Sequence, residues 1–267
     1  MEEADMDSAE IIVDTPAYYA ASVKDFLVDA ADPDMLAEVL LHAHESYDPE
    51  HPTSEEQKRA WISEVRFLQY SFRDIPELED MFVALEMPLN KTGERIDIVL
   101  CGRNGTPPFV HILEAKTWHT TRRKGRRYKI YPYHGNRLGK RLFINLYDFQ
   151  GEIVTKIRSA IFKDPREQVE LYRSRVVEAL NRHTQRNTAN RVFASVVLYN
   201  CKKITEEFRF ALDYCGDGQP FETIPIYTQR AENGSRAIAD LIDMLKVGIV
   251  NDGKSVYETL MEALNTT

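Results

Sequence analysis

The run from Val192 to Tyr199 constrains the fold of this chain more than any other segment. It reads Val-Phe-Ala-Ser-Val-Val-Leu-Tyr and carries no charged residue. A short apolar run of this kind predicts a strand that is buried on both faces. Such strands lie in the middle of a sheet that helices cover on both sides, so we expect an α/β protein.

The other elements predicted along the chain fit this class. Ser54 and Gln57 delimit a capping box, Ser-Glu-Glu-Gln, which opens a helix from Glu55 to Phe72. Asp164-Pro165 opens a second long helix, because proline is favoured in the first helical turn. The remaining elements are two short helices within 16–44, strands at 81–87, 95–101, 109–116 and 224–228, a turn at 90–93, and helices over 235–246 and after 253. We therefore expect a mixed central sheet flanked by helices.

Composition divides the chain of 267 residues into three parts. Residues 1–54 form an acidic helical N-terminal appendage, residues 55–230 form the core with a basic insertion at 117–163, and residues 231–267 form a C-terminal helical extension. A chain of this length suits one large domain with added segments.

Charge is distributed unevenly along the chain. The net charge is −8, but residues 1–58 hold 16 acidic side chains against Lys24 and Lys58, so the rest of the chain is basic. Residues 117–163 hold 12 Lys or Arg against Asp148 and Glu152. This asymmetry predicts a surface that attracts a polyanion.

Location and redox state follow from simpler features. No apolar run approaches the ~20 residues of a membrane helix, and the acidic start is unlike a signal peptide, so we expect a cytoplasmic protein without membrane contact. The three cysteines, Cys101, Cys201 and Cys215, show no CxxC spacing, which favours neither a disulfide framework nor a zinc site.

Two neighbouring predicted strands carry charged side chains where strands disfavour them. Asp97 lies within Arg95 to Leu100, and Glu114 and Lys116 close the next strand. Alternate residues of a strand share a face, so Glu114 and Lys116 lie on one side, and pairing of the two strands can bring Asp97 there too. Two carboxylates and an ammonium group are thus expected to converge.

This set suits the hydrolysis of phosphodiester bonds. Asp97, Glu114 and the backbone carbonyl of Ala115 supply hard oxygen ligands for Mg²⁺ or Mn²⁺. Lys116 would orient and help deprotonate water, or stabilise charge on phosphorus. The spacing is also common by chance; in the alternative interpretation, Asp97 pairs with Lys116 on a solvated face and Glu114 only ends a strand.

These strands resemble the core of the PD-(D/E)XK nucleases. The resemblance lies in Arg95-Ile96-Asp97-Ile98-Val99-Leu100 and in the segment from Val110 to Trp118. The segment from Asp164 to Tyr172 resembles the Q-x-x-x-Y helix of the RecB-like branch, which includes nuclease-like domains of bacterial helicase and defence proteins. Covering roughly residues 55–199, the resemblance implies a restriction-endonuclease-like fold and Mg²⁺-dependent DNA cleavage.

The resemblance also implies roles for individual residues. Gln168 would help to position the active site, and Tyr172 would contact DNA. Glu64 is the candidate for the acidic residue that the family carries on the helix before the sheet, and it equally fits the solvent face of an amphipathic helix. DNA is favoured over RNA, with a helicase or another defence subunit as a partner.

A basic segment begins six residues after Lys116. Its positive charges alternate with aromatic residues, a composition that suits phosphate neutralisation and base stacking. We therefore expect a DNA clamp at the mouth of the site, the alternative being a solvated loop. The cations assigned to nucleic-acid binding are Arg122, Arg123, Lys124, Arg126, Arg127 and Lys129.

Two other functions stay open on sequence alone. One is a nucleic-acid-binding module that cleaves nothing and recruits another subunit. The other is a protein-interaction subunit whose residues 1–58 mimic DNA or cover the basic segment. The run from Gly248 to Ser255 matches the P-loop pattern, but a helix rather than a strand is predicted before it, so we expect no nucleotide site there.

Overall fold

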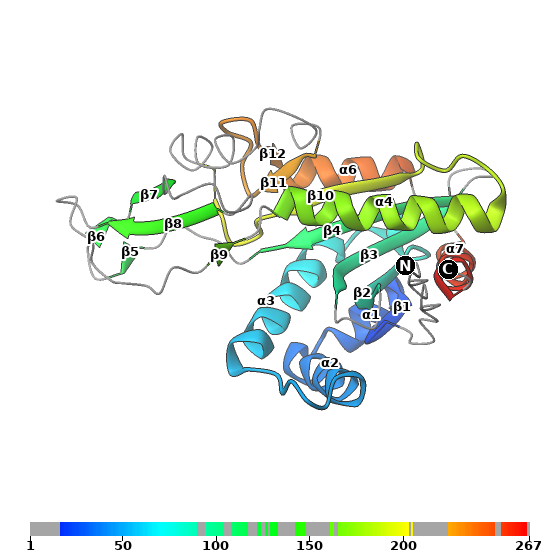
Figure 1. The fold of residues 1–267 in the computed structure, drawn as a ribbon, viewed down its shortest axis with the longest axis horizontal. Coiled ribbons are helices and arrows are strands. Elements are labelled where there is room, and N and C mark those ends of the chain that lie inside the picture. The colour runs from blue at the N-terminus through cyan, green and yellow to red at the C-terminus, as the bar shows by residue number, and fades with distance from the viewer. Residues whose placement is uncertain are drawn as a thin grey trace, which may run out of the picture.

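The structure, a computed structural model, has a seven-stranded sheet at its centre (Figure 1). It describes residues 17–89, 94–103, 108–116, 165–202, 204, 224–248 and 252–265, and the backbone of five short strands between 122 and 162. The central strands, in sheet order, are β1 (Tyr19–Ser22), β2 (Phe82–Pro88), β3 (Arg95–Arg103), β4 (Pro108–Ala115), β10 (Val192–Val197), β11 (Ile226–Thr228) and β12 (Arg236–Ala237).

The sheet is mixed, as predicted. Strands β1 to β4 pair antiparallel, whereas β4, β10, β11 and β12 run parallel to one another. The apolar strand β10 lies between β4 and β11, and most of its side chains are buried. The α/β class is therefore confirmed.

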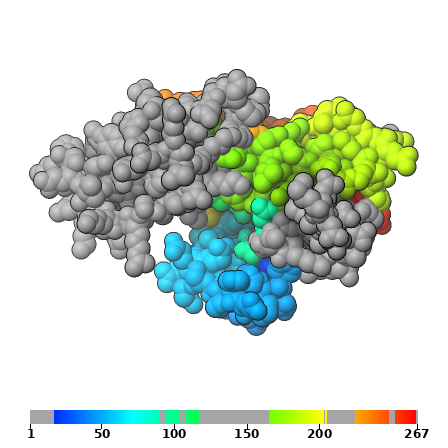
Figure 2. Space-filling view, viewed as in Figure 1, coloured from blue at the N-terminus to red at the C-terminus, as the bar shows by residue number. Residues whose placement is uncertain are grey.

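Helices cover both faces of this sheet. One face packs against α1 (Val23–Asp29), α2 (Pro33–Tyr47), α3 (Glu55–Phe72) and α6 (Ile238–Gly248). The other face packs against α4 (Pro165–Thr184) and α7 (Gly253–Asn265). In the space-filling view, α4 lies along one flank of the molecule and α2 and α3 along the opposite flank (Figure 2).

Helix α3 forms as its sequence predicts. The Ser54 hydroxyl accepts the backbone N–H of Gln57 at 3.1 Å and caps the first turn. Trp61, Val65 and Leu68 form its buried stripe against the sheet, and each is no more than 1% exposed. Burial of each such side chain contributes about 1.5–3 kcal/mol to the free energy of folding. This burial fixes the rotation of α3 about its axis, and with it the direction of the polar residues beside the stripe.

Two short strands were not predicted from the sequence. β1 holds only four residues, too few for a clear period-2 pattern, and it forms because its backbone pairs with β2. β12 holds two residues beside β11. Residues 17–54, 231–248 and 252–265 thus supply strands to the central sheet and helices to its two cores.

Some predictions concern residues that the structure does not describe. These are the turn at 90–93, Cys215 and the acidic first sixteen residues. In the basic insertion only strand backbones are described, in two small sheets: β5 (Arg122–Arg123) with β6 (Arg126–Arg127), and β7 (Lys129–Pro132) with β8 (Leu142–Tyr147) and β9 (Ile161–Phe162). Among the described helices, none has the length and apolar character needed to cross a membrane.

Gly253 begins α7 in close contact with the sheet. Its N–H donates to the Asp80 carbonyl at 3.2 Å. A Cβ at this position would lie 2.4 Å from the Phe82 nitrogen and 2.7 Å from the Cys101 carbonyl oxygen. Gly253, the second glycine of the P-loop-like run, is therefore required for close packing. Helix α6 precedes the run, whereas a P-loop follows a strand.

We predict that Gly253→Ala lowers the free energy of unfolding by about 1–3 kcal/mol, because backbone atoms of two strands must move apart. Chemical denaturation measures this change. Lys254→Ala, at an exposed position in the same turn, is the control and should unfold like the wild type. Equal stability of all three proteins would contradict the packing role.

Candidate active site

The site forms where β3 and β4 stop pairing. Their last pair is Ile98 with Leu113. Beyond it, Asp97 Oδ2 accepts the backbone N–H of Ala115 at 2.8 Å. The Lys116 N–H donates instead to the Val197 carbonyl of β10 at 2.9 Å. The Asp97 side chain thus replaces a backbone acceptor and holds the ends of two strands together.

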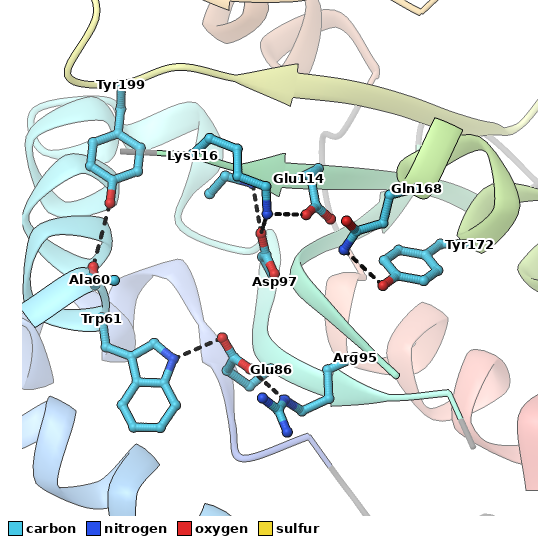
Figure 3. A network of polar contacts seen from close by, with 11 residues as sticks. Ala60, Trp61, Glu86, Arg95, Asp97, Glu114, Lys116, Gln168, Tyr172 and Tyr199 are labelled. Atoms are coloured by element: carbon cyan, nitrogen blue, oxygen red, sulfur yellow. Dashed lines mark hydrogen bonds and ion pairs between the residues drawn. The ribbon is translucent and has the colours of Figure 1, made fainter. Parts of the chain in front are cut away.

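The three residues predicted to converge do so (Figure 3). Lys116 Nζ donates to Glu114 Oε1 and lies 3.8 Å from Asp97 Oδ2. Glu114 is fully buried, whereas the Lys116 side chain is 27% exposed. The ammonium group therefore lies between the two carboxylates at the edge of the solvent.

Two further carboxylates lie next to this group. Glu64 of α3 is buried, and burial together with the charge of Asp97 raises its pKa well above the usual value. Glu86 of β2 is buried as well, with its pKa raised by burial and then by Asp97. Glu64 is thus buried and does not lie on a solvent-exposed face of α3.

Glu86 was missed in the sequence analysis, although it is an acidic residue inside an apolar strand, the same signal that marked Asp97. It adopts a left-handed backbone conformation with φ of 51°. Its carboxylate accepts the Trp61 Nε1–H at 2.8 Å and the Arg95 Nε–H at 2.8 Å. This φ is unusual outside glycine and marks a local distortion of β2 opposite Asp97.

The cluster brings several acidic side chains together. Its four carboxylates face two cations, Arg95 and Lys116. Burial, followed by the charge of Asp97, raises the pKa of Glu114 to about 8 despite the opposing effect of Lys116. Burial alone would lower the pKa of Lys116, but Asp97 and Glu114 outweigh it and raise that pKa, so the ammonium is charged at neutral pH.

Asp97 and Glu114 are the residues that could hold a divalent cation. Glu114 Oε2 is buried and has no hydrogen-bond partner among the described residues, an arrangement that costs free energy unless something else satisfies it. Carboxylate oxygens are hard ligands, and Mg²⁺ is often bound by one or two carboxylates with waters completing its shell. Among the described residues, no group of three or more His, Cys, Asp or Glu side chains has a geometry suited to a metal ion.

Helix α4 brings Gln168 and Tyr172 to one side of the cluster (Figure 3). Gln168 Nε2 donates to the Tyr172 hydroxyl at 2.9 Å. Tyr172 is only 5% exposed, and burial followed by the charge of Glu114 raises its pKa to about 12. The side chains of Arg122, Arg123, Lys124, Arg126, Arg127 and Lys129 lie outside the described residues.

Tyr199 lies on the other side of the cluster and was not assigned a role from the sequence (Figure 3). Its hydroxyl donates to the Ala60 carbonyl of α3 at 3.4 Å. Burial, then the charge of Glu64, raises its pKa. The cluster is therefore bounded by α4 on one side and by α3 with Tyr199 on the other.

A second polar pair in the sheet does not form a nucleophilic site. His111 Nε2 lies 2.8 Å from Ser195 Oγ, but the residues are only 1% and 0% exposed. Burial lowers the pKa of His111 to about 3, so the ring is neutral. No substrate can reach this hydroxyl without opening the sheet.

Comparison with protein-family models, curated proteins and solved structures found no match for the chain.

We predict that Glu114→Gln raises stability at alkaline pH when chelators remove divalent cations. The pKa of Glu114 is about 8 in the folded chain, above its ordinary value of 4.5. Between about pH 4.5 and pH 8, the folded chain therefore binds more protons than the unfolded chain. The free energy of unfolding falls as pH rises across that window. Glutamine removes this loss and keeps an acceptor for Lys116. The expected gain above pH 8 is about 1–2 kcal/mol.

Denaturant unfolding from pH 5 to pH 9 in EDTA tests this prediction. Glu178→Gln, on the exposed surface of α4, is the matched control and should follow the wild type at every pH. A Glu114→Gln protein that is less stable than the wild type at pH 9 would contradict the electrostatic account.

Proposed function

We propose that this protein is a metal-dependent nuclease with a restriction-endonuclease-like core, and that it hydrolyses phosphodiester bonds, with DNA as the favoured substrate. The observation that carries the proposal is the convergence of Asp97, Glu114 and Lys116 where β3 and β4 separate. One carboxylate oxygen of Glu114 is buried there without a hydrogen-bond partner in the part of the chain that the structure describes. A fold that needed only stability would not bury this excess of carboxylates together.

Mg²⁺ or Mn²⁺ held by Asp97 and Glu114 would supply Lewis-acid chemistry, offsetting phosphate charge and lowering the pKa of water. Such a cation also fits the electrostatics, because it would favour the ionised form of Glu114, whose pKa is raised by burial and then by the charge of Asp97. Burial, and then the charge of Asp97, raise the pKa of Glu64 well above its usual value, and a cation in the cluster would favour the ionised form of this side chain.

Lys116 has the chemical role of a fixed positive charge. Its raised pKa keeps it protonated, so it donates hydrogen bonds to a phosphate oxygen or to the attacking water rather than removing a proton in its resting state. It is partly exposed and can leave Glu114 when a cation binds that carboxylate. The carboxylates of Asp97 and Glu114 would then both be available as ligands of the cation.

Gln168 orients this centre. Its amide donates to the Tyr172 hydroxyl, which leaves the amide oxygen as an acceptor beside Glu114. Tyr172 is packed in the core, so it supports Gln168 through its hydroxyl more than it offers its ring to a base. The basic segment after Lys116 supplies positive charge for the substrate strand. We place the enzyme in the cytoplasm, in a defence or DNA-processing system with a helicase or similar subunit.

We predict that purified protein cleaves nucleic acid with Mg²⁺ or Mn²⁺ and not with EDTA. Asp97→Asn and Lys116→Ala should each lower the cleavage rate at least about 100-fold, because each removes charge at the reacting centre. Circular and linear DNA, single- and double-stranded, and RNA are the substrates to compare. Lys246→Ala, on the exposed surface of α6, controls for loss of a lysine.

Unchanged cleavage by Lys116→Ala would overturn the proposal. Absence of cleavage by the wild type, with nucleic acid still bound, would favour the alternative of a recruiting subunit that keeps the fold without the activity. Denaturant melts of each variant separate loss of chemistry from loss of folding.

A further inference from the structure

A groove opens on the α3 side of the sheet, next to the candidate active site. It has a volume of about 770 Å³ and is bounded by α3, the segments that follow β10 and β11, and the start of α6. It therefore lies at the carboxyl ends of parallel strands, where α/β sheets bind ligands. The side chains that line it include Arg66, Phe67, Tyr70, Tyr199, Gln229 and Arg230. We call it the α3 groove.

Tyr199 connects the α3 groove with the carboxylate cluster. Its ring lines the groove, and its hydroxyl reaches α3 at Ala60, one turn before Glu64. Phe67 stacks on the same ring with centroids 5.2 Å apart and planes 17° apart. Gln229 Nε2 donates to the Tyr199 carbonyl at 3.2 Å, which ties the ends of two strands together. Tyr199 thus belongs both to the wall of the groove and to the surroundings of the carboxylate cluster.

The chemistry of the groove is that of a polyanion site. No described residue that lines it is acidic, although the whole chain carries a net charge of −8. Arg66 and Arg230 place two guanidinium groups on it. Arg66 makes one exposed ion pair, to Asp34 at 3.4 Å, which is weak and easily exchanged for a phosphate.

Aromatic surface accompanies these charges. Tyr70 is 70% exposed, although large aromatic side chains are usually covered. The guanidinium of Arg73 lies 4.4 Å from the centre of its ring and supports one side of it. An exposed ring beside arginines is the combination on which unpaired bases stack, whereas duplex bases are already stacked and paired.

We propose that the α3 groove binds a single strand of nucleic acid next to the scissile phosphate, with Arg66 and Arg230 contacting phosphates and Tyr70 stacking on a base. This inference rests on the proposed nuclease function and assigns it a substrate subsite. DNA and RNA single strands share the required phosphates and bases, so the sugar is decided by experiment.

Fluorescence anisotropy with labelled dT12, U12 and a 12-base-pair duplex, in EDTA, tests the groove without cleavage. Arg66→Ala/Arg230→Ala should weaken binding of a single strand about tenfold and reduce the slope of log K against log salt by about 1.4, the value for two phosphate contacts. Arg182→Ala/Arg186→Ala removes two exposed arginines, one in the last turn of α4 and one just after the helix, and should bind like the wild type.

Tyr70 gives an independent test. Tyr70→Ala should weaken single-strand binding about fivefold or more, whereas Tyr70→Phe keeps the ring and should bind like the wild type. If the groove variants lose binding to dT12 alone or to U12 alone, the result supports the α3 groove as a single-strand site and identifies the sugar that it prefers. Unchanged single-strand binding, equal loss in the control double variant, or loss confined to the duplex would overturn the groove.

Cleavage assays with Mg²⁺ separate this inference from the proposed function. The groove variants should raise KM and leave kcat near the wild-type value, since they retain Asp97, Glu114 and Lys116. If Asp97→Asn abolishes cleavage while the groove variants bind and cleave normally, the nuclease stands and the groove fails. If the groove variants lose binding but the wild type never cleaves, the groove stands and the nuclease fails.

Discussion

The hydrogen bond from the Ala115 N–H to the Asp97 carboxylate is the interaction on which the rest of the site depends. It forms where the backbone ladder between β3 and β4 ends, so a charged side chain satisfies a backbone donor that would otherwise be buried and unpaired. It thereby orients one carboxylate and positions the end of β4. Glu114 and Lys116 follow from that position, because their side chains alternate along the same strand.

The two helical layers determine how much the cluster is desolvated. Glu64 is buried on helix α3, and α4 places Gln168 and Tyr172 on one side of the cluster. Apolar stripes on both helices are buried against the sheet, and this burial offsets the unfavourable proximity of the carboxylates. The fold thus maintains an electrostatically costly arrangement, which the proposed cation would compensate.

Much of this could be predicted from the sequence, because charged residues inside apolar strands and capped amphipathic helices are local signals. Asp97, Glu114 and Lys116, and the bounds of α3, are of this kind. Glu86 carries the same signal, but its left-handed backbone is a tertiary feature that no local pattern reveals. β1 and the α3 groove were missed because both arise from segments distant in sequence, such as 19–22 beside 82–85 and α3 beside the ends of β10 and β11.

Direct binding of Mn²⁺ tests the central claim most closely, because it asks whether the carboxylate cluster is a divalent-cation site without requiring a substrate. The electron paramagnetic resonance signal of free Mn²⁺ can be titrated against the wild type, Asp97→Asn and the exposed control Glu178→Gln at pH 8. Asparagine keeps an acceptor for the Ala115 N–H, so the strand ends stay joined while one ligand charge is removed. We predict that the wild type and the control bind Mn²⁺ with equal affinity and that Asp97→Asn binds it at least about tenfold more weakly. Equal binding by Asp97→Asn, or no binding by the wild type at millimolar Mn²⁺, would contradict the account.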